Sequence, residues 1–153
     1  MRILGVDVGR RRVGLALSDP AAILARPWRT IQAGASPEAS AAEVAAAVAI
    51  AGQDEDLGRI SEAVVGLPRR LGGEDTHGTT LAREFAAALG RLTGVDVHLQ
   101  DERLTSHEAD RLLAEREPDW RRRKARVDAA AAAIILQDFL DARARRETRG
   151  GVC

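Results

Sequence analysis

The sequence predicts an α/β fold, a mixed β-sheet covered by helices, and two observations carry that prediction. Apolar strand-like runs alternate with helical segments in the order β-β-β-α-β-α-β-α-α, which implies parallel pairing through helical crossovers. The two opening runs are separated by only three arginines, so we expect them to pair as an antiparallel hairpin. The chain has 153 residues, 45% of them hydrophobic, which is enough for one domain with its own core.

Five stretches have the composition of strands. The hairpin consists of ILGVDVG and VGLALS, which are apolar on both faces, as in strands that are covered from two sides. WRTIQA is a weaker third strand, and AVVGLP is a continuous apolar run that ends at a proline. The last, VDVHLQ, alternates apolar with polar residues, a pattern typical of a strand with one polar face.

Four segments favour helices: about 36–52, 79–92, 105–115 and 127–146. The first begins with Ser36 followed by a proline, a combination typical of a helix start. The last dissolves into the polar sequence RARRETRGGVC, where no apolar stripe continues. We therefore expect one domain over residues 1–143 and a disordered polar tail over residues 144–153.

The bulk composition excludes several classes of protein. The formal net charge is zero, with 23 basic and 23 acidic residues, which excludes a uniformly basic surface but allows a local basic patch. The only cysteine, Cys153, cannot form a disulfide within the chain, in keeping with a reducing compartment. No apolar run approaches roughly 18 residues, and the first residues lack the pattern of a secretory signal. We expect a cytoplasmic protein that does not associate with membranes.

Acidic residues occupy three places where a core element would be apolar. Asp7 lies between two valines of the first strand, Asp101 and Glu102 end the VDVHLQ strand, and Asp128 opens an alanine-rich helix. Each has a plain structural interpretation: an acid bonded to the hairpin backbone, a solvated strand end, and an acid that the helix dipole favours. A buried carboxylate otherwise needs an ionic partner or a metal ion, so together the acids predict one common site.

The chemistry of such a site suits hydrolysis of a phosphodiester. Converging carboxylates are hard oxygen ligands for Mg²⁺ or Mn²⁺, and two ions about 4 Å apart can activate water and stabilise a leaving oxygen. The chain has no GxSxG, CxxC or HExxH motif that would indicate other chemistry. Strand alternation places Glu102 on the polar face, which we expect to meet solvent and substrate, and Asp101 on the apolar face. Glu102 is therefore the preferred ligand and Asp101 the reserve.

Four motifs, in this order and spacing, resemble the YqgF/RuvX family: GVDVGRRRVGLALSD, VVGLPRRLGGED, DERLTSHEA and KARVDAAAAAIILQDFL. The resemblance covers about residues 1–142 and implies an RNase H-like fold, a mixed five-stranded sheet flanked by helices. It implies that Asp7, Glu102 and Asp128 are catalytic acids that hold Mg²⁺ or Mn²⁺. The implied activity is cleavage of nucleic acid to a 5′-phosphate and a 3′-hydroxyl. The names of the family point to 5′ processing of pre-16S rRNA in ribosome biogenesis and to Holliday-junction resolution.

A nuclease also needs cations for the phosphates of its substrate. Residues 116–126, REPDWRRRKAR, hold six basic residues against two acids and run into Asp128, so we expect a basic loop beside the acids. The candidate nucleic-acid ligands are Arg11, Arg12, Arg69, Arg103, Arg121, Arg122, Arg123 and Lys124. For each of them, solvated surface is the alternative interpretation.

Three other functions compete with this prediction. A Holliday-junction-type or single-stranded DNA nuclease in repair or recombination would use the same acids, and a junction resolvase would be a two-fold homodimer. A non-catalytic ribosome-assembly or transcription factor could share the fold without turnover. A nucleotide-binding ATPase also begins with a D-x-G hairpin, but it needs two such domains. We predict a metal-dependent nuclease, a monomer or homodimer, that acts on RNA or on branched or single-stranded DNA.

Overall fold

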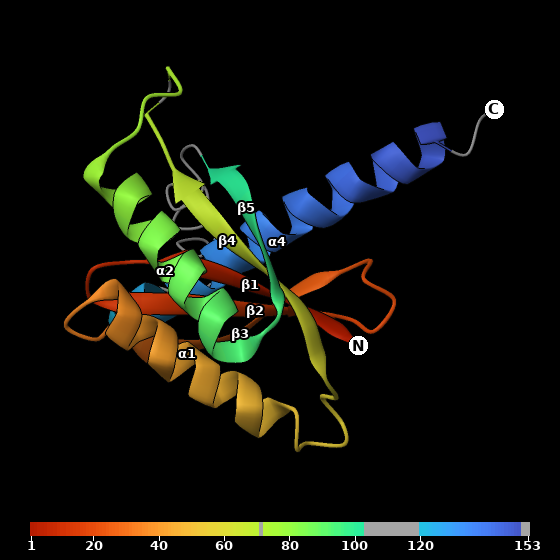
Figure 1. The fold of residues 1–153 in the computed structure, drawn as a ribbon, viewed down its shortest axis with the longest axis horizontal. Helices are drawn as coiled ribbons and strands as arrows, with labels where there is room; N and C mark the ends of the chain where they lie inside the picture. Colours follow the sequence, from red (N-terminus) through yellow and green to blue (C-terminus); the bar gives the residue numbers. More distant parts are fainter. Residues whose placement is uncertain (71, 103–119, 151–153) are drawn as a thin grey trace.

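The computed structural model describes residues 1–70, 72–102 and 120–150 (Figure 1). Its strands are β1 (Arg2–Val8), β2 (Arg12–Ser18), β3 (Ala25–Gln32), β4 (Ile60–Pro68) and β5 (Asp96–Glu102). Its helices are α1 (Pro37–Ala51), α2 (His77–Thr93) and α4 (Trp120–Gly150). The helix expected over 105–115 lies outside the described residues. None of the described helices is both long and apolar enough to cross a membrane.

The five strands form one mixed sheet in the order β3-β2-β1-β4-β5, which confirms the predicted sheet. β1 pairs antiparallel with β2, as the hairpin prediction requires, and β2 pairs antiparallel with β3. β4 lies between β1 and β5 and runs parallel to both. The C-terminal ends of β1, β4 and β5 therefore meet at one edge of the sheet, and this edge carries Asp7 and Glu102.

Two apolar layers cover the sheet, one on each face (Figure 1). Helices α1 and α2 pack on one face, where Phe85 and Leu89 of α2 are fully buried. Helix α4 crosses the opposite face, where it buries Leu136 and its neighbours. The helix approaches closely because β1 has a glycine beneath it: a Cβ at Gly5 would lie 2.7 Å from the Cβ of Leu136.

The helix starts on the α1 and α2 side follow from local capping. The Ser36 hydroxyl accepts a hydrogen bond from the Ala39 amide, and a proline fills the first turn of α1, as the sequence predicts. At α2, Thr76 and Thr79 cap each other's backbone amides reciprocally. These caps fix the two helix starts beside the C-terminal end of β1.

Helix α4 is longer than predicted at both ends. It begins at Trp120, so residues 120–126 of the basic segment are helical where a loop was expected. It continues to Gly150, so residues 144–150 are helical where a disordered tail was expected. Arginine, alanine and glutamate are strong helix formers, and they extend a helix without an apolar stripe. Two hydrogen bonds from Arg143 to Glu62 on β4, at 3.0 and 2.8 Å, also tie this part of α4 to the sheet.

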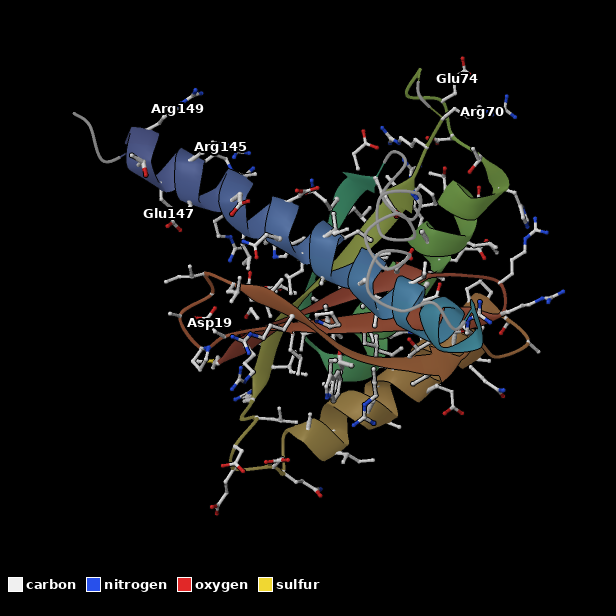
Figure 2. The ribbon with its side chains drawn as sticks, turned by 180° about the vertical axis from the view of Figure 1, so that it is seen from behind. Asp19, Arg70, Glu74, Arg145, Glu147 and Arg149 are labelled. Atoms are coloured by element: carbon white, nitrogen blue, oxygen red, sulfur yellow. The ribbon has the colours of Figure 1, made fainter. Side chains whose placement is uncertain are left out.

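The last turns of α4 project away from the sheet (Figure 1). Figure 2 shows Arg145 and Arg149 on one side of this projecting segment and Glu147 on the other. All three residues are exposed. The C-terminal segment therefore presents an arginine-bearing side to solvent.

The polar face of β5 is not the solvent-facing side that the sequence predicted. His98 Nε2 lies 2.9 Å from Glu62 Oε1, the His98 ring packs against Phe139 of α4, and Glu102 is only 8% exposed. Leu99, on the apolar face, is 45% exposed. The prediction was wrong because α4 packs Phe139 against this face and the neighbouring strand β4 supplies Glu62 as the polar partner of His98.

Candidate active site

Asp7 lies on the face of β1 that α4 covers. Side chains alternate along a strand, and Gly5, two residues earlier, touches α4 directly. The positions beside Asp7 on both neighbouring strands are glycines. Gly14 of β2 is its direct pairing partner, and Gly66 of β4 comes one residue after Val65, which pairs with Val6. Asp7 is therefore flanked by two strand positions that carry no side chain.

These two glycines make room for two other acidic residues. A Cβ at Gly14 would lie 1.9 Å from the carbonyl oxygen of Asp128, and a Cβ at Gly66 would lie 2.7 Å from Oε2 of Glu102. The backbone of Asp128 therefore rests directly on β2, and the carboxylate of Glu102 lies over β4. The structure thus gathers Asp7, Glu102 and Asp128 at one edge of the sheet, from β1, β5 and α4.

The electrostatics of this edge show a surplus of negative charge. Burial, as the larger cause, and the nearby charge of Asp128 together raise the pKa of Asp7 to about 7. Burial also raises the pKa of Glu102 to about 8, with the charge of Asp7 as the second cause. The charge of Asp7 thus interacts with the charges of both other acids. A cation bound beside Asp7 would relieve the repulsion among the three carboxylates.

Arg12 provides part of the missing positive charge. Its Nε lies 2.7 Å from Oδ2 of Asp128, and both side chains are partly buried. The sequence predicts Arg12 as a ligand for phosphate, whereas in the structure its guanidinium is bound to one of the candidate catalytic acids. The pair links β2 to α4 and holds Asp128 beside the sheet.

The donor set fits a hard divalent cation in its chemistry. All three candidate ligands are carboxylates, which suit Mg²⁺ or Mn²⁺, and the two glycines let the Asp128 backbone and the Glu102 carboxylate approach the sheet. In the described part of the structure, no three acidic, histidine or cysteine side chains lie close enough together to share one ion. One oxygen of Asp128 is instead held by Arg12.

Asp101 and Arg69 lie apart from this group. The Asp101 side chain is 43% exposed, and its Oδ2 lies 4.0 Å from Nη1 of Arg69. Arg69 Nε lies 3.3 Å from Oδ1 of Asp75, so this arginine, predicted as a phosphate ligand, already has acidic neighbours. Asp101 is the residue that alternation turns away from Glu102, and the pKa of Glu102 responds to Asp7 instead.

The structure describes only some of the remaining basic residues that the sequence predicts as phosphate ligands. Arg11 is exposed in the turn between β1 and β2, one residue before Arg12. The backbone of residues 121–124 is helical and precedes Asp128 by four to seven residues, or one to two turns of α4. The side chains of Arg121, Arg122, Arg123 and Lys124 lie outside the described part of the structure, as does Arg103.

The arrangement defines a class of protein. A mixed sheet in the order β3-β2-β1-β4-β5, with an acid at the end of the central strand, is an RNase H-like domain. The fowlpox virus resolvase, solved with its Holliday junction DNA, superposes with a TM-score of 0.53 over 93% of this chain and 98% of that one. The identity is 9%, so this likeness concerns the fold alone.

The sequence comparisons identify the family. The model of the RuvX family, described as "Holliday junction resolvase", matches residues 1–142, and the chain belongs to this family. A protein of Koribacter versatilis named "Putative pre-16S rRNA nuclease" is 44% identical over 142 residues, which are 93% of this chain and 88% of that protein. A relative from Pelotomaculum thermopropionicum with the same name is 40% identical over 152 residues, covering 98% and 94% of the two chains. The resemblance drawn from the four motifs is confirmed.

Sequence reasoning missed the two residues that shape the site. Gly14 and Gly66 were assigned to strands but given no role, although a glycine inside a strand often marks a close approach of another group. That signal could have pointed to both positions. The pairing of Arg12 with Asp128 had no comparable signal, because the two residues are 116 positions apart in the chain.

Proposed function

We propose that this chain is a divalent-metal-dependent nuclease that hydrolyses phosphodiester bonds in RNA and processes the 5′ end of pre-16S rRNA. The observation that carries the proposal is Asp7 on the central strand, flanked by Gly14 and Gly66, over which Asp128 and Glu102 lie. The names of the relatives support the choice of pre-16S rRNA as substrate. A precursor rRNA as substrate implies a cytoplasmic location.

Asp7, Glu102 and Asp128 would hold Mg²⁺ or Mn²⁺. When bound, these ions would activate a water for in-line attack and stabilise the leaving oxygen, which yields a 5′-phosphate and a 3′-hydroxyl. Burial of Asp7 and Glu102 makes their interaction with a cation stronger than it would be in water. Ion binding also requires both acids to be ionised, so the raised pKa values favour activity at neutral to alkaline pH.

We assign Arg12 one role in the metal-free site and another in the metal-bound site. In the structure it holds Asp128, which keeps one buried negative charge compensated. If Asp128 held a metal ion instead, the guanidinium of Arg12 would be free beside the site and could donate to a phosphate oxygen. Arg11 in the same turn and the basic residues 121–124 at the start of α4 would contact the flanking phosphates.

The test is cleavage of three labelled substrates: a precursor rRNA fragment, single-stranded DNA and a four-way DNA junction. Each is incubated with Mg²⁺, with Mn²⁺ or with EDTA, and with wild type, Asp7→Asn and Asp96→Asn. Asp96 is a matched control, because it is an exposed aspartate at the opposite end of β5. We expect metal-dependent cleavage of the RNA that falls at least about a hundredfold in Asp7→Asn and persists in Asp96→Asn. Equal cleavage by Asp7→Asn would refute the proposed site, and no cleavage by folded wild type would favour an assembly factor.

A second candidate function is Holliday-junction resolution, which the description of the family model favours. Symmetrical cutting of a junction requires a two-fold dimer. Preferential cleavage of the four-way junction, together with a dimer in sedimentation, would select this function. A monomer that cleaves only the RNA fragment would exclude it.

A further inference from the structure

A cavity of about 210 Å³ lies beside the C-terminal end of β1, on the face opposite to Asp7. Val8 lines it and belongs to the apolar layer beneath α1 and α2, whereas Asp7 faces α4. The turn after β1 contributes Arg10, the segment before α1 contributes Ser36, and the start of α2 contributes His77 and Leu81. The cavity therefore begins one residue beyond the central candidate catalytic acid.

Arg10 brings a positive charge to this cavity without an acidic neighbour among the described lining residues. Arg10 and His77 line it, and no acidic residue does so among the described residues. Neither side chain forms an ion pair or a hydrogen bond with another described residue, whereas Arg12 is paired with Asp128. These two arginines of the hairpin thus differ in their surroundings. Arg12 pairs with an acid of the site, whereas Arg10 faces an open cavity.

We propose that this cavity binds one sugar–phosphate unit of a single-stranded segment of the substrate, about three nucleotides from the bond that is cleaved. The inference rests on the proposed nuclease function and adds a binding site to it. Arg10 and His77 would bind the phosphate, and the apolar walls at Val8 and Leu81 would contact the sugar. A volume of about 210 Å³ is below that of pockets for drug-sized ligands, and it suits one such unit.

The distance and the geometry specify a single strand. Arg10 comes three positions after Asp7, at most about 11 Å of chain, which corresponds to roughly three nucleotides of rise along one strand. The two positions lie on opposite faces, so the nucleic acid must turn around the end of the sheet at the β1–β2 turn. A duplex is stiff over about 150 base pairs and cannot make this turn, whereas a single strand can.

The experiment measures binding of a fluorescein-labelled ten-nucleotide RNA by anisotropy, in EDTA so that nothing is cleaved, over a series of salt concentrations. The variants are Arg10→Ala, Arg91→Ala and Ala35→Phe, each checked for folding by its melting temperature. Arg91 is a matched control, because it is exposed in the last turn of α2, about 21 Å along the helix from His77. Ala35→Phe fills the cavity from its exposed rim without changing charge.

For the single strand, we expect Arg10→Ala to raise Kd about tenfold and to reduce the salt slope by about 0.7. Ala35→Phe should raise Kd with an unchanged slope, and Arg91→Ala should leave Kd within about twofold. A blunt RNA duplex should bind all variants alike. Equal Kd values for Arg10→Ala and Arg91→Ala, or an equal loss on duplex RNA, would overturn the proposal.

Cleavage kinetics separate this inference from the proposed function. If wild type cleaves, Arg10→Ala should raise KM about tenfold and leave kcat within about twofold, because it removes binding without touching the acids. If wild type cleaves nothing, the proposed nuclease function fails, and the anisotropy series still decides whether the cavity binds a single strand. A loss of kcat at unchanged KM would contradict a role in binding.

Discussion

Replacing Asp7 by asparagine is expected to stabilise the metal-free protein while it removes the proposed activity. The pKa of Asp7 is raised from 3.8 to about 7 by burial and by the charge of Asp128. The folded protein therefore holds this proton more tightly than the unfolded chain does. As the pH rises from about 4 through 7, the unfolded chain ionises first, and stability is lost over that window.

The magnitude follows from the difference of about three pKa units. At about 1.4 kcal/mol per unit, ionised Asp7 costs the folded state at most about 4 kcal/mol at pH 8. An asparagine carries no charge, but its amide must still be desolvated, so we expect a net gain of about 2 kcal/mol. For a chain of this size, that gain raises the melting temperature by about 4–8 °C.

The assay is thermal unfolding in EDTA at pH 8 and at pH 4, for wild type, Asp7→Asn and the exposed control Asp96→Asn. We expect the gain at pH 8 only, and only in Asp7→Asn. At a hundred times its Kd, Mg²⁺ or Mn²⁺ should then stabilise wild type by about 2.7 kcal/mol and raise its melting temperature, and it should stabilise Asp7→Asn by at most about half as much. A lower melting temperature of Asp7→Asn in EDTA at pH 8 would refute the reasoning.

Two further predictions concern the scaffold. Gly14→Ala should destabilise the protein by about 3 kcal/mol and abolish cleavage, because its Cβ would meet the backbone of Asp128; Gly72→Ala, with 3.6 Å to the nearest atom, is the neutral control in the same urea titrations. Glu62→Gln should cost about 1 kcal/mol at pH 7, because Arg143 holds the Glu62 pKa near 2. That contribution is complete above about pH 4.5 and is lost as the pH falls towards 2, so a gap between the two proteins that stays constant from pH 6 to pH 2.5 would contradict it.

Much of the fold could be predicted because its signals are local. The opening hairpin, the mixed sheet and the Ser36 cap follow from short patterns of apolar residues, glycine, serine and proline, and the structure confirms them. The extent of α4 could not be predicted in the same way. Its ends lack an apolar stripe, and its C-terminal part is tied to the sheet by Arg143 and Glu62, which are 81 residues apart in the chain.

The candidate site shows the same division between local and distant effects. The three acids could be selected from the sequence, because a carboxylate in an apolar element is visible there, and their catalytic role stays a prediction. Glu102 was preferred over Asp101 for a reason that the structure overturns: its face is covered by α4 instead of facing solvent. Pairing across the fold, such as that of Arg12 with Asp128, decides the charge of the site and depends on the finished topology.

The most direct test of the account is a titration of the metal-free protein with Mn²⁺, followed by electron paramagnetic resonance of the free ion at pH 8. The central claim is that Asp7, Glu102 and Asp128 together hold a divalent cation. We expect saturable binding to wild type and to Asp96→Asn, and binding at least about tenfold weaker in Asp7→Asn and in Glu102→Gln. Equal binding of Mn²⁺ by wild type and by both site variants would contradict the claim.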